Sequence, residues 1–212
     1  MNIQPSVKAI FFDFGGVITD SPFEAFNQFE KKNKIPLDFI RKVNSINPNV
    51  NAWAQFEKNQ INLEQFDQLF SLESEKLGYK IAGKKIIQLL NGCIRPQMVS
   101  LVKRCKKKYI TACLTNNIKP SSVTSSNSET DNHKKIHQVF HHVIESSKIG
   151  VRKPEAAFYQ YACTEVGVEP TSVIFLDDLG INLKPARAMG MITIKVKKRE
   201  KKVFMELHQR KI

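Results

Sequence analysis

Three carboxylates in this chain of 212 residues come directly after short apolar runs. The run Ala9–Phe12 is followed by Asp13, and the run Val173–Leu176 is followed by Asp177 and Asp178. Clustered carboxylates repel one another unless a cation is present, and hard oxygen ligands of this kind suit Mg²⁺. An aspartate can also act as a nucleophile and form an aspartyl-phosphate. The three aspartates are therefore candidate ligands of a metal ion, and one of them could react with a phosphoryl group.

Two further segments offer a hydroxyl, amides and a cation. The apolar run Ile110–Leu114 ends in Thr115, Asn116 and Asn117. Lys153 stands in a turn just before a predicted helix, where it could neutralise a transferring phosphoryl group. Taken alone, each of these residues also suits an ordinary turn, strand end or exposed loop. The case for a functional site therefore depends on their coming together.

The elements that must position these residues alternate along the chain between strand-like and helix-like patterns. Strands separated by helices predict an α/β fold, with a Rossmann-like parallel sheet and helices on both of its faces. In such sheets the ligand site lies beyond the carboxyl ends of the strands, which is where the polar residues stand. The expected strands are 7–12, 109–115, 143–145, 173–176 and 191–196, and the expected helices are 96–108, 134–142, 155–166 and 182–189.

Residues 21–90 show apolar spacings of three, four and seven, which are typical of helices, and no strand-like alternation. The pattern predicts a small helical unit inserted after the first strand. Within this unit, Asn62 is the expected N-cap of a helix and residues 44–51 are an expected loop. Further along the chain, the Ser-, Thr- and Asn-rich segment 119–132 is an expected mobile loop.

The formal net charge is +13, and basic residues gather in the runs 103–108 and 195–202. This sign suits phosphorylated ligands or nucleic acid, but basic runs are weak signals, and we favour a solvated surface over a nucleic-acid or membrane patch. The four cysteines form no C-x-x-C pair, so we expect reduced thiols. No apolar stretch approaches the roughly 20 residues that span a bilayer, and no signal-peptide pattern is present. We therefore expect a cytoplasmic protein, and the sequence does not indicate its oligomeric state.

Four motifs occur in order along the chain: Asp-Phe-Gly-Gly-Val at 13–17, Leu-Thr-Asn at 114–116, Arg-Lys-Pro at 152–154 and Phe-Leu-Asp-Asp at 175–178. Together they resemble the motifs of the haloacid dehalogenase (HAD) superfamily. Residues 175–187 resemble more specifically the N-terminal phosphatase domain of soluble epoxide hydrolases and related stand-alone phosphatases. No G-x-S-x-G turn is present, so we expect no epoxide hydrolysis.

The resemblance implies a role for each aspartate and its neighbours. Asp13 is then the nucleophile and a Mg²⁺ ligand, and the backbone carbonyl of Gly15 is another ligand. Asp178 is the second carboxylate ligand, and Asp177 ligates through water or supports the site. Asn182 orients the metal site from the first turn of the next helix, and the alternative is an ordinary N-cap of that helix.

The resemblance also implies a phosphate cradle and a cap. Thr115 and the backbone amide of Asn116 hold the phosphoryl oxygens, and Lys153 balances charge on both the nucleophile and the phosphate. The helical unit matches the small cap that covers such sites and selects substrates. The expected domains are a Rossmann-like core of residues 1–19 and 93–212, and a helical cap of residues 20–92.

One position departs from the family pattern. A second aspartate, which protonates the leaving group and then activates water, usually stands two residues after the nucleophile, and here that residue is Gly15. General acid–base groups contribute about 10²–10⁴-fold in rate. We therefore expect a Mg²⁺-dependent phosphatase for a small phosphorylated metabolite that turns over alkyl phosphates weakly and aryl or acyl phosphates better. Alternatively, another residue or a water takes over the role of this aspartate.

Two other functions stay open at this point. A haloacid dehalogenase is compatible with Gly15, because a halide leaves without a proton, but the pair of Asp177 and Asp178 argues for a metal ion and so against it. A catalytically reduced binding protein is the second alternative, motivated by Gly15 and the net charge of +13. The sequence does not identify the substrate.

Overall fold

The computed structural model describes residues 6–90, 92–119 and 135–197, together with residues 203, 205 and 207. The described part of the chain contains a five-stranded sheet in the order β3-β2-β1-β4-β5, and every pair of neighbouring strands is parallel. The strands are β1 (Ala9–Phe12), β2 (Ile110–Thr115), β3 (His142–Glu145), β4 (Val173–Asp177) and β5 (Ile192–Lys195). The predicted α/β fold with a parallel sheet is confirmed.

The central strand β1 is apolar throughout because it has neighbours on both edges and helices on both faces. All four of its residues are buried. Phe12 pairs with Cys113 of β2 and with Leu176 of β4. This register brings the residues that follow these strands to one edge of the sheet, so Asp13 lies level with Asp177.

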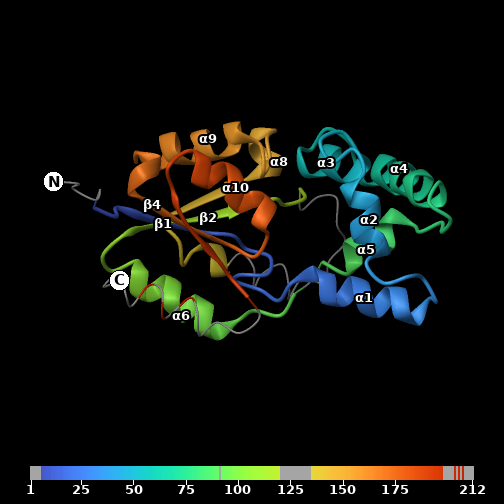
Figure 1. The fold of residues 1–212 in the computed structure, drawn as a ribbon, viewed down its shortest axis with the longest axis horizontal. Coiled ribbons are helices and arrows are strands. Elements are labelled where there is room, and N and C mark those ends of the chain that lie inside the picture. Colours follow the sequence, from blue (N-terminus) through green and yellow to red (C-terminus); the bar gives the residue numbers. More distant parts are fainter. Residues whose placement is uncertain are drawn as a thin grey trace.

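Helices cover both faces of the sheet (Figure 1). The helix α6 (Pro96–Cys105) packs on the face that carries Phe12, whereas α9 (Ala156–Val166) and α10 (Gly180–Ala188) pack on the face that carries Phe11. Alternate residues of β1 thus enter two separate hydrophobic clusters, as strand geometry requires. The short helices α8 (Ser146–Ile149) and η2 (Pro170–Ser172) lie in the connections before α9 and β4.

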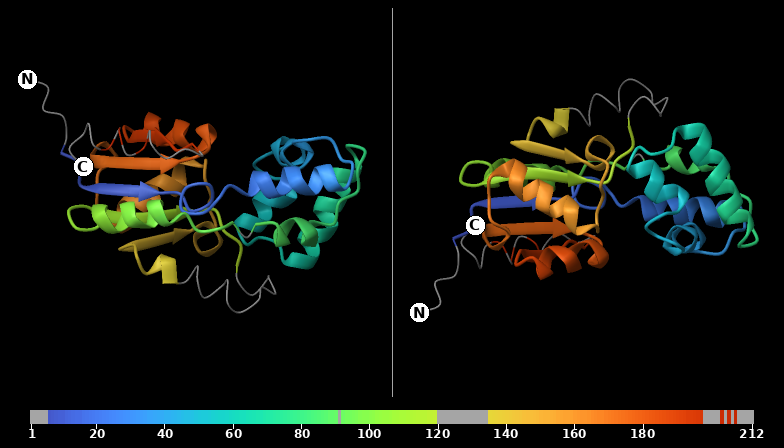
Figure 2. Two further views of the ribbon diagram at one scale, coloured as in Figure 1. Left: turned by 90° about the horizontal axis from the view of Figure 1, so that it is seen from below. Right: turned by 90° about the horizontal axis from the view of Figure 1, so that it is seen from above.

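Five helices follow β1 and gather beyond the ends to which the strands point (Figure 2). They are α1 (Pro22–Lys32), α2 (Phe39–Ser45), α3 (Ala52–Glu57), α4 (Leu63–Glu75) and α5 (Gly83–Gln88), and we call them the helical insert. The insert has a hydrophobic cluster of its own, in which Phe26, Phe66 and Phe70 are buried. The ring of Trp53 meets the ring of Phe66 edge-on at 5.7 Å between centroids.

The two chain segments that join the insert to the sheet lie side by side, because Thr19 and Ile94 form an antiparallel bridge. Asn62 is confirmed as an N-cap. Its side chain accepts a hydrogen bond from the Gln65 backbone at 2.9 Å, and the Gln65 side chain accepts one from the Asn62 backbone at 2.9 Å. This reciprocal capping box satisfies two amide groups at the start of α4.

Several predicted boundaries differ from the structure. Helix α10 begins at Gly180 rather than at Asn182, so Asn182 lies inside the first turn and is not the N-cap. Residues 135–137 are helical, but His142 already belongs to β3, so the helix predicted over 134–142 is wrong at its end. The predicted loop 119–132 falls outside the described residues except for Lys119. Among the described helices, none combines the length and the apolar character that crossing a membrane requires.

Candidate active site

Asp13, Asp177 and Asp178 come together at the carboxyl edge of the sheet. One oxygen from each carboxylate lies within 4.8 Å of the others. Asp13 and Asp177 are buried, and Asp178 is partly exposed. The backbone amide of Asp13 donates to the carbonyl of Leu176 at 2.8 Å, so the parallel pairing of β1 with β4 continues into the site and fixes the spacing of these aspartates.

Lys153 reaches this cluster from the segment between α8 and α9. Its Nζ lies 2.7 Å from Asp13 Oδ1 and 2.9 Å from Asp177 Oδ2, and the side chain is only 1% exposed. Burial alone lowers the pKa of Lys153, but the charges of Asp13 and Asp177 outweigh it and raise the pKa above its ordinary value. Lys153 is therefore a protonated bridge between the two buried carboxylates.

Asp177 is held on both of its carboxylate oxygens by groups of the protein. The Nδ2 of Asn182 lies 3.2 Å from Oδ1 and 3.0 Å from Oδ2, and the backbone amide of Leu179 donates to Oδ1 at 2.8 Å. The hydroxyl of Tyr159 donates to the Asn182 carbonyl at 2.6 Å, which fixes the start of α10 against α9. With Lys153 on Oδ2, this arrangement suits a supporting role for Asp177 better than direct ligation of a metal ion.

Neighbouring carboxylates contribute to raised pKa values of Asp13 and Asp178. Burial raises the pKa of Asp13 well above its ordinary value, an effect that Lys153 opposes and that Asp177 and Asp178 reinforce. Burial and the charge of Asp177 raise the pKa of Asp178 to about 6. Three carboxylates against a single lysine favour a cation between them, and oxygen donors of this kind suit Mg²⁺. The side chains present thus fit the metal ion that the family resemblance implies.

Two neighbouring glycines in the loop after β1 differ in the space around them. A β-carbon at Gly16 would overlap the carboxylate of Asp178, and Gly16 has a φ of +76°, which favours glycine. A β-carbon at Gly15 would meet no heavy atom within 4 Å. Gly16 is therefore required for the close approach of Asp178, whereas the position of the missing acid/base aspartate has room for a side chain.

The residues after β2 supply the amides of the site. Thr115 is the last residue of β2 and is buried. The side chain of Asn116 brackets the peptide of Lys153: its Oδ1 accepts from the Lys153 amide at 2.9 Å, and its Nδ2 donates to the Lys153 carbonyl at 2.9 Å. Asn116 therefore fixes the segment that carries the buried lysine, a role that the sequence did not suggest.

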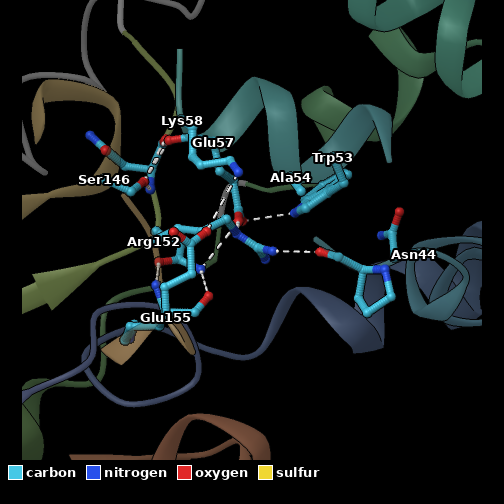
Figure 3. Close-up of polar contacts among 12 residues, drawn as sticks. Asn44, Trp53, Ala54, Glu57, Lys58, Ser146, Arg152 and Glu155 are labelled. Atoms are coloured by element: carbon cyan, nitrogen blue, oxygen red, sulfur yellow. Dashed lines mark hydrogen bonds and ion pairs between the residues drawn. The ribbon is translucent and has the colours of Figure 1, made fainter. Parts of the chain in front are cut away.

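A buried carboxylate from the insert also reaches this segment, and the sequence pattern did not identify it as part of the site. Glu57, at the end of α3, accepts hydrogen bonds from Arg152 Nε at 2.5 Å and from Asn116 Nδ2 at 3.1 Å (Figure 3). Arg152 directly precedes Lys153, and the sequence singled out the lysine alone. The one signal in the sequence is an acidic residue next to Phe56 in a largely apolar helix. This signal does not show which residues Glu57 contacts.

Residues 7–190 match the family model described as haloacid dehalogenase-like hydrolase. The chain belongs to the haloacid dehalogenase-like hydrolases. It is 32% identical over 201 residues to acyl-CoA dehydrogenase family member 10 of Mus musculus, covering 92% of this chain and 18% of that protein. It is 30% identical over 209 residues to bifunctional epoxide hydrolase 2 of Mus musculus, covering 90% of this chain and 36% of that protein. The chain thus spans well under half the length of these two relatives.

A relative of similar length is the sesquiterpene phosphatase astK of Aspergillus oryzae, which is 26% identical over 190 residues with 87% of each chain covered. Among solved structures, a HAD family enzyme from Bacteroides thetaiotaomicron in complex with magnesium and inorganic phosphate has a TM-score of 0.61 and 21% identity, covering 91% of this chain and 95% of that one. An L-2-haloacid dehalogenase has a TM-score of 0.57 and 20% identity, covering 91% of this chain and 86% of that one. At these identities the two structures share the fold with this HAD hydrolase.

Proposed function

We propose that this HAD hydrolase is a Mg²⁺-dependent phosphatase that acts on a small phosphorylated metabolite through an aspartyl-phosphate on Asp13. The observation that supports it most is the buried bridge of Lys153 between Asp13 and Asp177, with a third carboxylate at the same edge. A protonated lysine beside an aspartate holds the nucleophile in place and balances the negative charge of an incoming phosphoryl group.

The reaction proceeds in two displacements. A carboxylate oxygen of Asp13 attacks phosphorus, the bond from phosphorus to the leaving oxygen breaks, an aspartyl-phosphate forms, and the leaving oxygen takes a proton from solvent. Thr115 and the backbone amide of Asn116 hold the phosphoryl oxygens, while Lys153 balances their charge. Water then attacks the phosphorus of the aspartyl-phosphate, loses its proton to solvent and releases inorganic phosphate with the Asp13 carboxylate restored.

The residues that would hold Mg²⁺ are Asp13, Asp178 and the backbone carbonyl of Gly15, and Asp177 and Asn182 support them. When bound, the cation supplies charge stabilisation at the phosphoryl oxygens. The Bacteroides thetaiotaomicron enzyme of the same fold was solved with magnesium and inorganic phosphate, and the relative astK is named a phosphatase. Both favour phosphate over other substrates for this chain.

The helical insert is the proposed cap of this site. We assign residues 20–92 to the cap, and residues 1–19 and 93–212 to the core. The insert lies beyond the carboxyl ends of the strands, on the side where the aspartates meet (Figure 2). That placement suits a unit that covers the substrate and selects it.

A second candidate is a haloacid dehalogenase. With Gly15 the chain lacks the acid that protonates an oxygen leaving group, and a halide leaves without a proton. A haloacid dehalogenase also shares the fold of this chain. The cluster of three carboxylates favours the phosphatase, since halide displacement by an aspartate needs no metal ion. Chloride release from 2-chloropropionate without Mg²⁺ would reverse this ranking.

The test compares wild type with Asp13→Asn on an aryl phosphate such as p-nitrophenyl phosphate, with Mg²⁺ and with a chelator. Wild type releases phosphate only with Mg²⁺, and the variant loses at least about 10³-fold in rate, as removal of a nucleophile does. Activity that persists in Asp13→Asn rejects the nucleophile. Binding of inorganic phosphate without any hydrolysis by wild type would instead indicate a binding protein.

A further inference from the structure

Glu57 is the last residue of α3 and is buried where the helical insert meets the sheet domain (Figure 3). Its Oε1 accepts a hydrogen bond from Trp53 Nε1 at 2.8 Å, within the insert. Its Oε2 accepts from Arg152 Nε at 2.5 Å and from Asn116 Nδ2 at 3.1 Å, both outside the insert. Its backbone carbonyl accepts from the Ser146 hydroxyl at 2.7 Å. One residue thus joins the insert to three segments of the sheet domain.

Two of these contacts lead directly to Lys153. Asn116, which donates to Glu57, also brackets the Lys153 peptide with two hydrogen bonds of 2.9 Å. Arg152 is the residue before Lys153, and its Nη1 donates to the carbonyl of Pro48 in the insert at 3.0 Å. A movement of α3 would therefore pull on both the amide and the turn that hold the buried lysine.

The contact between Glu57 and Arg152 is an ion pair between two nearly buried side chains. The side chains of Glu57 and Arg152 are only 9% and 13% exposed, so water screens their attraction little. A nearby pair of the same kind, Lys58 with Glu155 at 3.5 Å, also joins the insert to the sheet domain but touches neither Asn116 nor Lys153 in the described contacts. The chain thus offers a matched control for an insert contact that does not reach the site.

We propose that Glu57 is a positioning residue through which the helical insert sets Lys153 and Asn116 for phosphoryl transfer. The inference rests on the proposed phosphatase function, because it assigns Lys153 and Asn116 to the phosphoryl group. It also makes the link reciprocal: phosphate bound at these two residues changes the surroundings of Glu57 and, through Oε1, of Trp53.

Trp53 is the only tryptophan in the chain, so its fluorescence reports on this contact without relying on turnover. The variants are Glu57→Gln, which keeps the size and removes the charge, and Lys58→Met as control. Each is measured for kcat and KM on p-nitrophenyl phosphate with Mg²⁺, for binding of inorganic phosphate by calorimetry, and for the change in Trp53 emission that phosphate causes.

We expect Glu57→Gln to lose about 10- to 100-fold in kcat with a smaller change in KM, since misplacement of a charge-balancing group costs the chemical step most. The phosphate-induced change in Trp53 emission disappears in Glu57→Gln, although calorimetry still detects phosphate. Lys58→Met keeps both the kcat and the emission change of wild type. A kcat reduced equally by Lys58→Met would show that any insert contact suffices and would overturn the assignment.

The proposed function and this inference fail in different ways. If Asp13→Asn hydrolyses phosphate esters as fast as wild type, or if wild type hydrolyses none, the proposed phosphatase mechanism is wrong. The Trp53 emission measurement still decides whether Glu57 links the phosphate site to the insert. Wild-type kcat in Glu57→Gln, or the absence of any emission change when phosphate binds to wild type, overturns the role of Glu57 whatever the outcome with Asp13→Asn.

Discussion

The carboxyl edge of the sheet and the helical insert bury different kinds of side chain. At the edge, the buried groups are charged: Lys153 lies between Asp13 and Asp177 at 2.7 and 2.9 Å. In the hydrophobic cluster of the insert they are largely aromatic, and Phe56 stacks on Phe66 with 4.6 Å between ring centroids. Burial of apolar rings stabilises a structure over a wide range of pH and metal concentration, whereas buried charges stabilise it only while they balance. The site should therefore respond to conditions that leave the insert unchanged.

The largest effect that separates the two regions is expected from Lys153→Met. The variant leaves two buried carboxylates without their cation, and removal of one partner of a buried ion pair costs about 3–5 kcal/mol of stability. Added Mg²⁺ should restore part of this loss, because the metal ion also balances the aspartates. Urea denaturation with Mg²⁺ and with a chelator measures both effects.

Phe66→Ala is the comparison in the insert. Truncation of a buried phenylalanine also costs about 3–5 kcal/mol, but this loss should be the same with and without Mg²⁺. If Mg²⁺ rescued Phe66→Ala as much as Lys153→Met, the stability of the two regions would depend on the metal ion alike, and the contrast drawn above would be wrong.

The chemistry of the edge can be sharpened at Gly15, where a side chain has room. Gly15→Asp restores the acid that the family pattern places there and should raise kcat on an alkyl phosphate by about 10²-fold, the lower end of the range for general acid–base catalysis. The gain on an aryl phosphate should be smaller, because a phenolate leaves more readily without a proton. Steady-state rates on glycerol phosphate and p-nitrophenyl phosphate give the comparison.

Gly15→Asn is the control for this gain, since it adds a side chain of the same size without an acid. It should leave both rates near those of wild type. If the wild-type protein already hydrolysed alkyl and aryl phosphates at equal rates, the idea that protonation of the leaving group is impaired would be wrong.

A smaller effect is expected from Gly16→Ala, which places a methyl group where the Asp178 carboxylate lies. Displacing this carboxylate should weaken Mg²⁺ binding about tenfold, as changes next to metal ligands do. Gly15→Ala is the matched control one residue earlier, because its methyl group meets no atom within 4 Å. Calorimetric titration with Mg²⁺ compares the two variants. If Gly16→Ala and Gly15→Ala bound Mg²⁺ with equal affinity, Asp178 would not be a ligand of the metal ion.

The smallest effect concerns pH. The pKa of Asp178 in the folded chain is about 6, above its ordinary value of 3.8, so the folded state holds this proton more tightly than the unfolded chain does. Without Mg²⁺, the contribution of Asp178 to stability is then fully present below about pH 4 and lost as pH rises through about 6, and the part lost between pH 4.5 and 7 is about 2 kcal/mol. Urea denaturation of wild type and Asp178→Asn at pH 4.5 and 7 tests this. The same pH dependence in both proteins would exclude Asp178 as its source.

The residues that gather at the carboxyl edge of the sheet could be predicted from sequence, because parallel pairing of strands leaves little freedom in where the residues after each strand lie. Once the runs that end in Asp13, Thr115 and Asp177 are neighbouring parallel strands, their following residues must lie at one edge. The start of α10 was missed because the Asp177 carboxylate accepts from the Leu179 amide and fixes the chain before Gly180. No local pattern encodes such a contact.

Glu57 could not be predicted, and the reason is its distance along the chain from its partners. It contacts Asn116, 59 residues away, and Arg152, 95 residues away. Neither pairing follows from helical spacing or strand register, because it depends on how the insert docks on the sheet. The β3 boundary shows the same limit, since pairing of His142 with Ala112 overrode the helical pattern before it.

The measurement that tests the central claim most directly is a rapid acid quench of wild type during turnover of an aryl phosphate, followed by mapping of the phosphorylated peptide. Because Gly15 provides no base to activate water, the aspartyl-phosphate should accumulate, and the phosphate should map to Asp13 and be absent in Asp13→Asn. Steady phosphate release with no phosphorylated chain at any quench time, or with the phosphate on another residue, would contradict Asp13 as the nucleophile.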